Sequence, residues 1–189
     1  MWSPRIVAIG GTTRARSSTE LALRATLAAA EEQGATTTLF SGGELAQLPF
    51  YAPENPDRPA VAVRLVDELR AADGVVLGSP GYHGGISGLV KNAIDYVEDL
   101  RDDDRPYLSG RAIGCVATGY GWQGVVATLT GLRSVAHALR GWPTPLGAGV
   151  NTVEKVFDPE GVCIDDKVDF QLRTVAAEVI EFARKLEGS

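Results

Sequence analysis

The chain has 189 residues, with 18 basic and 24 acidic side chains, a net charge of −6, two cysteines and 22 glycines. Its length predicts a single domain over residues 1–189, large enough to bury a core without a disulfide or a metal. The acidic balance argues against a nucleic-acid partner, because binding a phosphate backbone requires a concentrated basic face. The excess of glycine indicates special backbone geometry, so the location of the glycines matters.

The cysteines and the N-terminus bear on the compartment. Cys115 lies in the apolar run 112–117, where a free thiol behaves as a small hydrophobe, and the two cysteines allow at most one disulfide. The apolar segment after Met1 is too short for a signal-peptide core or a membrane span. We therefore expect a cytoplasmic protein with no membrane partner. Histidine and cysteine are too few for a metal cluster.

Apolar runs of strand length alternate with longer segments of helical period, which is typical of a parallel sheet covered by helices on both faces. In chain order, we expect strands at 5–9, 36–40, 74–78, 112–117 and 144–147. We expect helices at 18–33, 60–72, 85 or 87 to 100, 124–140 and 165–186, and a proline-rich loop at 49–56. The pattern predicts an α/β fold with a doubly wound, five-stranded parallel sheet.

Three glycine-rich loops follow the first, third and fourth predicted strands, at the edge where a doubly wound sheet binds its ligand. The first, at 10–19, combines hydroxyls, arginines and the start of a helix, which predicts a phosphate site. In the alternative interpretation, Ser17 and Glu20 form a capping box and the arginines are merely solvated.

The second and third loops present aromatic side chains among glycines. Tyr82 stands in the second loop, and Tyr120 is separated from Trp122 by a glycine in the third. Such turns suit stacking on a planar ring, whose heteroatoms can accept hydrogen bonds from the exposed backbone amides. The alternatives are that the second loop is only a structural turn, that His83 makes an ordinary hydrogen bond, and that Trp122 begins the core of a helix.

Other conspicuous residues have structural explanations. His137 lies among apolar residues of a predicted helix, and Lys91 and Asn92 fit pairing within the third predicted helix and its interface. The acidic run at 98–104 is interleaved with arginines and lacks a glycine-turned calcium loop, which favours a solvated connection.

Three segments together carry a family resemblance. They are Gly-Thr-Thr-Arg-Ala-Arg-Ser-Ser-Thr at 11–19, Ser-Pro-Gly-Tyr-His-Gly-Gly-Ile-Ser-Gly-Leu-Val-Lys-Asn-Ala-Ile-Asp at 79–95, and Thr-Gly-Tyr-Gly-Trp-Gln-Gly at 118–124. In order and spacing they resemble the NADPH-dependent FMN reductase family, and the resemblance covers nearly the whole chain. It implies a flavodoxin-like fold with strand order 2-1-3-4-5, bound FMN, and NADPH or NADH as the hydride donor.

The resemblance also implies the site residues. The phosphate loop falls on Thr12, Arg14, Ser17, Ser18 and Thr19, the ring loop on Pro80, Gly81, Tyr82 and His83, and the loop over the other ring edge on Thr118, Gly119, Tyr120 and Gly121. Many relatives have an acidic residue at position 81 and asparagine at positions 83 and 19. Family membership implies a homodimer or homotetramer, with the third predicted helix contributing to the interface.

The implied activity is transfer of a hydride from NAD(P)H through FMN to an acceptor, which is a free flavin, a quinone, an azo or nitro compound, or a metal oxyanion. A flavin-dependent monooxygenase that receives reduced flavin is a further expected partner. Because the cofactor performs this chemistry, no catalytic side chain and no metal are expected.

Two alternatives belong to other classes of protein. A flavodoxin-type electron carrier binds FMN without oxidising nicotinamide, but such carriers are usually more strongly acidic. A receiver-type signalling domain needs an acidic pair at the end of the first strand, where this chain has Ile9-Gly10-Gly11.

Overall fold

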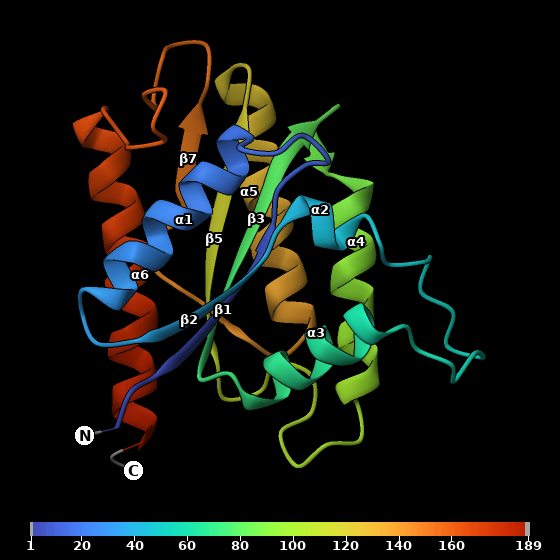
Figure 1. The fold of residues 1–189 in the computed structure, drawn as a ribbon. Coiled ribbons are helices and arrows are strands. Elements are labelled where there is room, and N and C mark those ends of the chain that lie inside the picture. Colours follow the sequence, from blue (N-terminus) through green and yellow to red (C-terminus); the bar gives the residue numbers. More distant parts are fainter. Residues whose placement is uncertain (1, 188–189) are drawn as a thin grey trace.

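The computed structural model describes residues 2–187 and contains a seven-stranded sheet with helices on both faces (Figure 1). The strands are β1 (Arg5–Gly10), β2 (Thr36–Phe40), β3 (Gly74–Tyr82), β4 (Gly85–Ile86), β5 (Ala112–Gly119), β6 (Trp142–Pro143) and β7 (Ala148–Asn151). The order is β2-β1-β3-β5-β6, with β4 paired to β3 and β7 to β5. All pairs are parallel except β3 with β4. The predicted α/β architecture with a parallel sheet is confirmed.

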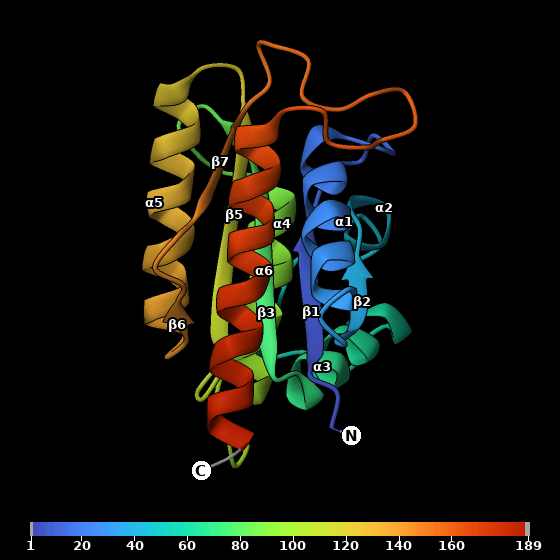
Figure 2. The same ribbon diagram turned by 90° about the vertical axis from the view of Figure 1, so that its left-hand side faces the viewer.

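Helices cover both faces of the sheet, and the side chains of β1 alternate between them. Ile6 and Ala8 pack in the layer of α1 (Ser18–Glu31) and α6 (Asp166–Glu187), which lie side by side in Figure 2. Val7 and Ile9 pack in the opposite layer. That layer contains α2 (Gly42–Leu45), α3 (Ala60–Ala71), α4 (Gly88–Asp95) with the 3₁₀ segment η1 (Tyr96–Leu100), and α5 (Trp122–Ala138). Burial on both faces explains the continuous apolar runs.

The end of β1 passes so close to β3 that a side chain has no room. A Cβ on Gly10 would lie 2.1 Å from the Gly78 carbonyl oxygen and 2.8 Å from the Leu23 Cδ1. Gly10 and Gly78 are also register partners in the sheet. Glycine at position 10 therefore lets the first loop leave the sheet directly beside β3.

The last part of the sheet differs from the prediction. Instead of one strand at 144–147, the chain forms β6 before this segment and β7 after it, and both pair with β5. Pro145 has no N–H to donate, and the Leu146 N–H donates to the Glu178 carboxylate at 2.9 Å rather than to a strand. The prediction of five strands in the order 2-1-3-4-5 is therefore replaced by seven strands in the order given above.

The connection after β3 also differs in detail. Strand β3 continues past Ser79–Pro80 and turns back as β4, so that Tyr82 pairs with Gly85. His83 and Gly84 form the turn with φ values of 51° and 83°. Positive φ at both central residues is typical of two-residue hairpin turns. The third predicted helix is consequently shorter at its start, and its second half is the 3₁₀ segment η1. Within residues 2–187, no helix has the length and apolar character needed to cross a membrane.

Candidate functional site

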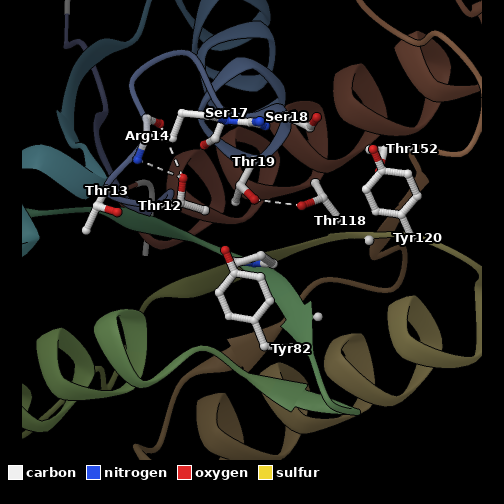
Figure 3. Close-up of a pocket in the computed structure, with 13 residues that line it drawn as sticks. Thr12, Thr13, Arg14, Ser17, Ser18, Thr19, Tyr82, Thr118, Tyr120 and Thr152 are labelled. Atoms are coloured by element: carbon white, nitrogen blue, oxygen red, sulfur yellow. Dashed lines mark hydrogen bonds between the residues drawn. The ribbon is translucent and has the colours of Figure 1, made fainter.

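A cavity of about 520 Å³ lies at the carboxyl edge of β1, β3 and β5 (Figure 3). The winding of the sheet reverses here, since α1 follows β1 on one face whereas α4 and α5 follow β3 and β5 on the other. The size falls within the range of about 300–1,000 Å³ that cofactor sites occupy. Its lining consists of Thr12, Thr13, Arg14, Ser17, Ser18, Thr19, Pro80, Gly81, Tyr82, Thr118, Gly119, Tyr120 and Thr152.

Helix α1 begins beside the cavity, and Ser17 is its N-cap. The Ser17 Oγ accepts a hydrogen bond from the Glu20 N–H at 3.3 Å, which leaves the hydroxyl proton available to a ligand. The Glu20 carboxylate accepts from the Arg16 N–H at 3.0 Å rather than from the Ser17 N–H, and it pairs with Arg24 at 2.7 Å. Only half of the capping box of the alternative interpretation therefore forms. Because Arg24 offsets the charge of Glu20, the N-terminus of α1 still attracts an anion.

The two arginines of the first loop have different surroundings. Arg14 lines the cavity, and within residues 2–187 its guanidinium has no hydrogen-bond or ion-pair partner. Its backbone is held by Thr12, whose Oγ1 accepts from the Arg14 N–H at 3.2 Å. Arg16 does not line the cavity and donates from Nη2 to the Pro159 carbonyl oxygen at 2.6 Å. Of these two guanidinium groups, Arg14 is the one free to bind an anion.

Two buried hydroxyls join α1 to β5 at the centre of the lining. The Oγ1 atoms of Thr19 and Thr118 lie 2.6 Å apart, and both side chains are almost fully buried. Figure 3 shows this contact between the first turn of α1 and the end of β5. One hydroxyl proton is used within the pair, so the second is available to a ligand.

The hairpin of β3 and β4 forms another wall. Tyr82 is 55% exposed and lies on the opposite side of the cavity from Ser17 and Ser18 in Figure 3. A Cβ on Gly81 would lie 2.9 Å from both the Gly124 carbonyl oxygen and the Thr128 Oγ1, so the strand packs tightly on the start of α5. Glycine at position 81 is therefore required by the packing on α5, and the neighbouring Tyr82 stays at the rim of the cavity.

The loop between β5 and α5 is held from outside by Asn151. Its Oδ1 accepts from the Gly121 N–H at 3.0 Å and from the Val153 N–H at 3.1 Å. The next residue, Thr152, lines the cavity and donates its N–H to the Gly119 carbonyl oxygen at 2.9 Å. Tyr120 is 86% exposed and lies beside Thr152 in Figure 3. The rim therefore carries two exposed tyrosines on separate loops.

The cavity brings together all the predicted site residues except His83 and Gly121. His83 is exposed at the tip of the hairpin, and Gly121 is the N-cap of α5. Thr13 and Thr152 line the cavity without having been predicted as site residues. Thr13 stands in the first loop, whose hydroxyl-rich pattern marks it, whereas the segment after β7 has no glycine-rich pattern that would have marked Thr152.

The other conspicuous residues lie away from the cavity. His137 is exposed on α5, and Trp122 is the first residue of that helix but is 57% exposed, which rules it out as a core residue. Lys91 pairs with Asp95, as expected within α4. Asn92 holds the loop after α2, because it accepts from the Tyr51 N–H at 2.9 Å.

The acidic run belongs to a network of ion pairs. Asp99 pairs with Arg58 at 2.7 Å, and this guanidinium holds the pKa of the Asp99 carboxyl below its usual range. Burial, together with the hydrogen bond to Asp99, raises the pKa of the Tyr51 hydroxyl to about 12. Asp103 pairs with Arg70 at 2.8 Å. Within residues 2–187, no group of three or more histidine, cysteine, aspartate or glutamate side chains is placed to hold a metal.

Comparison with known sequences places the cavity in a family context. Residues 4–154 match the sequence model of the family described as NADPH-dependent FMN reductase. A curated relative, the FMN-dependent NADPH-azoreductase of Staphylococcus haemolyticus, is 27% identical over 120 residues. This alignment covers 61% of the chain and 59% of the relative, so the chain spans less than two thirds of the length of that relative.

Solved structures agree on the fold. The flavoenzyme NAD(P)H:(acceptor) oxidoreductase FerB of Paracoccus denitrificans is similar with a TM-score of 0.79 and 18% identity, covering 96% of this chain and 98% of that chain. The apo form of an NADH:FMN oxidoreductase, EmoB, is similar with a TM-score of 0.73 and 21% identity, covering 97% of this chain and 90% of that chain. At such identities the similarity establishes the α/β flavodoxin-like fold.

Proposed function

Because the chain belongs to the NADPH-dependent FMN reductase family, we propose that it is an FMN-dependent oxidoreductase that passes a hydride from NAD(P)H through bound FMN to an acceptor. The observation that carries this proposal is the cavity at the switch point, which has exposed tyrosines on two loops and, on the third, the Arg14 guanidinium, which pairs with none of the described residues. These features suit the two ends of FMN, which are a phosphate and a flat ring.

The phosphate end is assigned to Thr12, Arg14, Ser17, Ser18 and Thr19. The Arg14 guanidinium supplies a positive charge, the Ser17 hydroxyl supplies a proton, and the N-terminus of α1 supplies backbone N–H groups. The Arg24 ion pair with Glu20 reduces the repulsion that a nearby carboxylate would exert on the phosphate.

The ring end is assigned to Pro80, Gly81 and Tyr82 and to Thr118, Gly119 and Tyr120, which line the cavity. His83 and Gly121 follow these residues in the two loops and are proposed only as flanking residues, because neither lines the cavity. Gly81 and Gly119 both line the cavity and have no side chains of their own, so their backbone is proposed to lie along the edge of the ring. Tyr82 and Tyr120 narrow the opening and offer faces on which the nicotinamide or the acceptor stacks.

Bound FMN would supply the hydride and electron transfer itself, and the residues assigned above would hold it. The side chains that line the cavity bind and orient the cofactor and the substrates, because Arg14, Tyr82 and Tyr120 are the titratable groups among the described lining residues and they form no acid/base pair.

We propose a small acceptor such as a free flavin, a quinone, an azo or nitro compound, or a metal oxyanion. The similarity to an azoreductase supports the azo compound in particular. A monooxygenase that receives reduced flavin is a further proposed partner.

The absorption spectrum of the purified protein, followed by oxidation of NADPH and of NADH with FMN, a quinone and an azo dye as acceptors, tests this function. We expect a flavin spectrum, or its appearance on adding FMN, together with steady-state turnover. A protein that binds FMN but oxidises neither nicotinamide would be a flavodoxin-type carrier and would contradict the proposal.

We further propose that residues 1–189 form one FMN-binding domain, that the protein works in the cytoplasm, and that it assembles as a homodimer or homotetramer through α4. The two free cysteines support a reducing compartment. An interface beside α4 is supported by Phe50, which is 89% exposed next to the Pro49 carbonyl oxygen that Asn92 of α4 binds. Light scattering during size-exclusion chromatography tests the assembly, and a monomer would contradict it.

A further inference from the structure

Arg16 has an unusual backbone conformation in the first loop. Its φ is 55°, in the left-handed region that a residue with a long side chain rarely adopts. Such a conformation persists only where neighbouring contacts hold it. Arg16 lies between Arg14 and Ser17, which both line the cavity, so its conformation sets where these two residues stand.

Two contacts hold Arg16, one on each side. Its N–H donates to the Glu20 carboxylate at 3.0 Å, and this carboxylate is fixed in turn by Arg24. Its Nη2 donates to the Pro159 carbonyl oxygen at 2.6 Å, although the two residues are 143 positions apart. The guanidinium is therefore occupied by the protein itself, in contrast to that of Arg14.

Pro159 belongs to the connection between β7 and α6, and we call residues 151–163, which begin with the last residue of β7 and include most of this connection, the 151–163 strap. Figure 2 shows this connection passing from the end of β7 across to the start of α1. The strap is closed within itself, because the Asp158 N–H donates to the Val162 carbonyl oxygen at 3.0 Å and the Val162 N–H donates to the Asp158 carboxylate at 2.8 Å. A closed turn presents the Pro159 carbonyl at a defined position.

The strap packs tightly against the first loop. Gly161 has a φ of 92°, and a Cβ there would lie 3.2 Å from the Arg16 Nη2 and 2.9 Å from the Leu21 Cδ2. At its other end the strap holds the third loop through Asn151, which accepts from the Gly121 N–H. One segment thus contacts both the phosphate wall and the ring wall of the cavity.

We propose that Arg16 is a positioning residue that, by anchoring on the 151–163 strap, holds the first loop in the shape that binds phosphate. This inference rests on the proposed function and assigns a role to a residue outside the cavity lining. The contact to Pro159 carries the anchoring, and the charge that meets the phosphate belongs to Arg14. Loss of the anchor loosens the phosphate wall and leaves the ring wall in place.

The test compares the dissociation constants of FMN and riboflavin, because riboflavin has the same ring without the phosphate. In Arg16→Met, which keeps the apolar stem but removes the donor, we expect the dissociation constant of FMN to rise about tenfold or somewhat less. The dissociation constant of riboflavin should stay unchanged. Arg16→Lys should restore part of the FMN affinity, because an ammonium can still donate to the Pro159 carbonyl oxygen.

A second variant separates anchoring from charge. Gly161→Ala displaces the strap from Arg16 without changing any charge. We expect it to raise the dissociation constant of FMN, as Arg16→Met does, and to leave that of riboflavin unchanged. Two matched controls lie far from the cavity. Arg184→Met removes another 2.6 Å bond from an arginine to a carbonyl oxygen, that of Gln33, and Gly34→Ala changes another glycine of positive φ, 86°.

Several outcomes would overturn the inference. If Gly161→Ala leaves FMN binding unchanged while Arg16→Met weakens it, Arg16 acts through its charge. If either substitution weakens the binding of riboflavin as much as that of FMN, the role of Arg16 is merely structural. The same holds if the control variants raise the dissociation constant of FMN as much as the test variants do. If the unmodified protein prefers FMN to riboflavin and neither Arg16→Met nor Gly161→Ala changes the ratio, this inference fails while the proposed function stands. If the unmodified protein binds neither flavin, both fail.

Discussion

Replacing Arg14 with alanine tests the phosphate end of the proposed site directly. The Arg14 guanidinium lines the cavity and, within residues 2–187, has no other partner, so its removal leaves no buried group unpaired. The effect should therefore appear in FMN binding and leave the free energy of unfolding almost unchanged. This separation of binding from stability makes Arg14 more informative than the buried residues of the lining.

The magnitude follows from the kind of contact. A hydrogen bond to a charged group contributes about 1.5–3 kcal/mol, which corresponds to roughly a tenfold to hundredfold change in a dissociation constant. Because the Arg14 side chain is exposed to solvent, screening reduces the Coulombic part, and we expect a value near tenfold at physiological ionic strength. The difference between Arg14→Ala and the unmodified protein should shrink further as salt is added.

Titration of the apoprotein with FMN, followed by the quenching of flavin fluorescence at low and high salt, measures this effect. Riboflavin serves as the ligand without phosphate, and its affinity should not change. Arg101→Ala is the matched control, since it removes an exposed arginine from the segment between η1 and β5, at the other end of the sheet. An FMN dissociation constant equal to that of the unmodified protein would refute the assignment of Arg14 to the phosphate.

Three further predictions concern stability. Thr118→Val leaves the buried Thr19 hydroxyl without its 2.6 Å partner, so the free energy of unfolding in urea should fall by about 1–3 kcal/mol. Gly10→Ala places a Cβ 2.1 Å from the Gly78 carbonyl oxygen, and urea unfolding should show a loss of at least about 3 kcal/mol or no folded protein. Burial raises the pKa of the Cys115 thiol to about 12. In the unfolded chain this thiol titrates near pH 8.5, so between that pH and 12 the folded state binds more protons and stability should fall as the pH rises, less steeply in Cys115→Ala. The free energy of unfolding in urea is measured for both proteins from pH 8 to 11. Equal slopes of this free energy against pH would contradict the prediction.

The four main strands were predictable because their signal is local. Three of them, β1, β3 and β5, are short apolar runs buried by helices on both faces, and the run itself predicts the strand. Strand β2 lies at the edge of the sheet and is only partly buried, but its three threonines favour a strand. The segment 144–147 was misassigned because its conformation depends on Glu178, which binds the Leu146 N–H from 32 residues further along the chain. That contact leaves no trace in the local pattern of residues, whereas Pro145 does, because a proline within a run argues against a central strand.

The candidate site shows the same division between local and distant causes. Its glycines, hydroxyls and tyrosines stand next to strand ends, and the topology of a doubly wound sheet brings those ends together. Thr152 could not be found in this way, since it reaches the cavity through the pairing of β7 with β5, which its N–H continues by donating to the Gly119 carbonyl oxygen. His83, by contrast, stands at the right place in the sequence but lies at the tip of a hairpin whose turn the sequence pattern did not predict.

The two arginines of the first loop show where a family pattern stops being informative. Both are exposed, both lie within the loop, and either charge would suit a phosphate. They differ in their contacts, because a strap more than a hundred residues away in sequence occupies the Arg16 guanidinium, whereas that of Arg14 has no partner within residues 2–187. A residue type in a motif therefore predicts which chemistry is available, whereas the long-range packing decides which copy of that residue performs it.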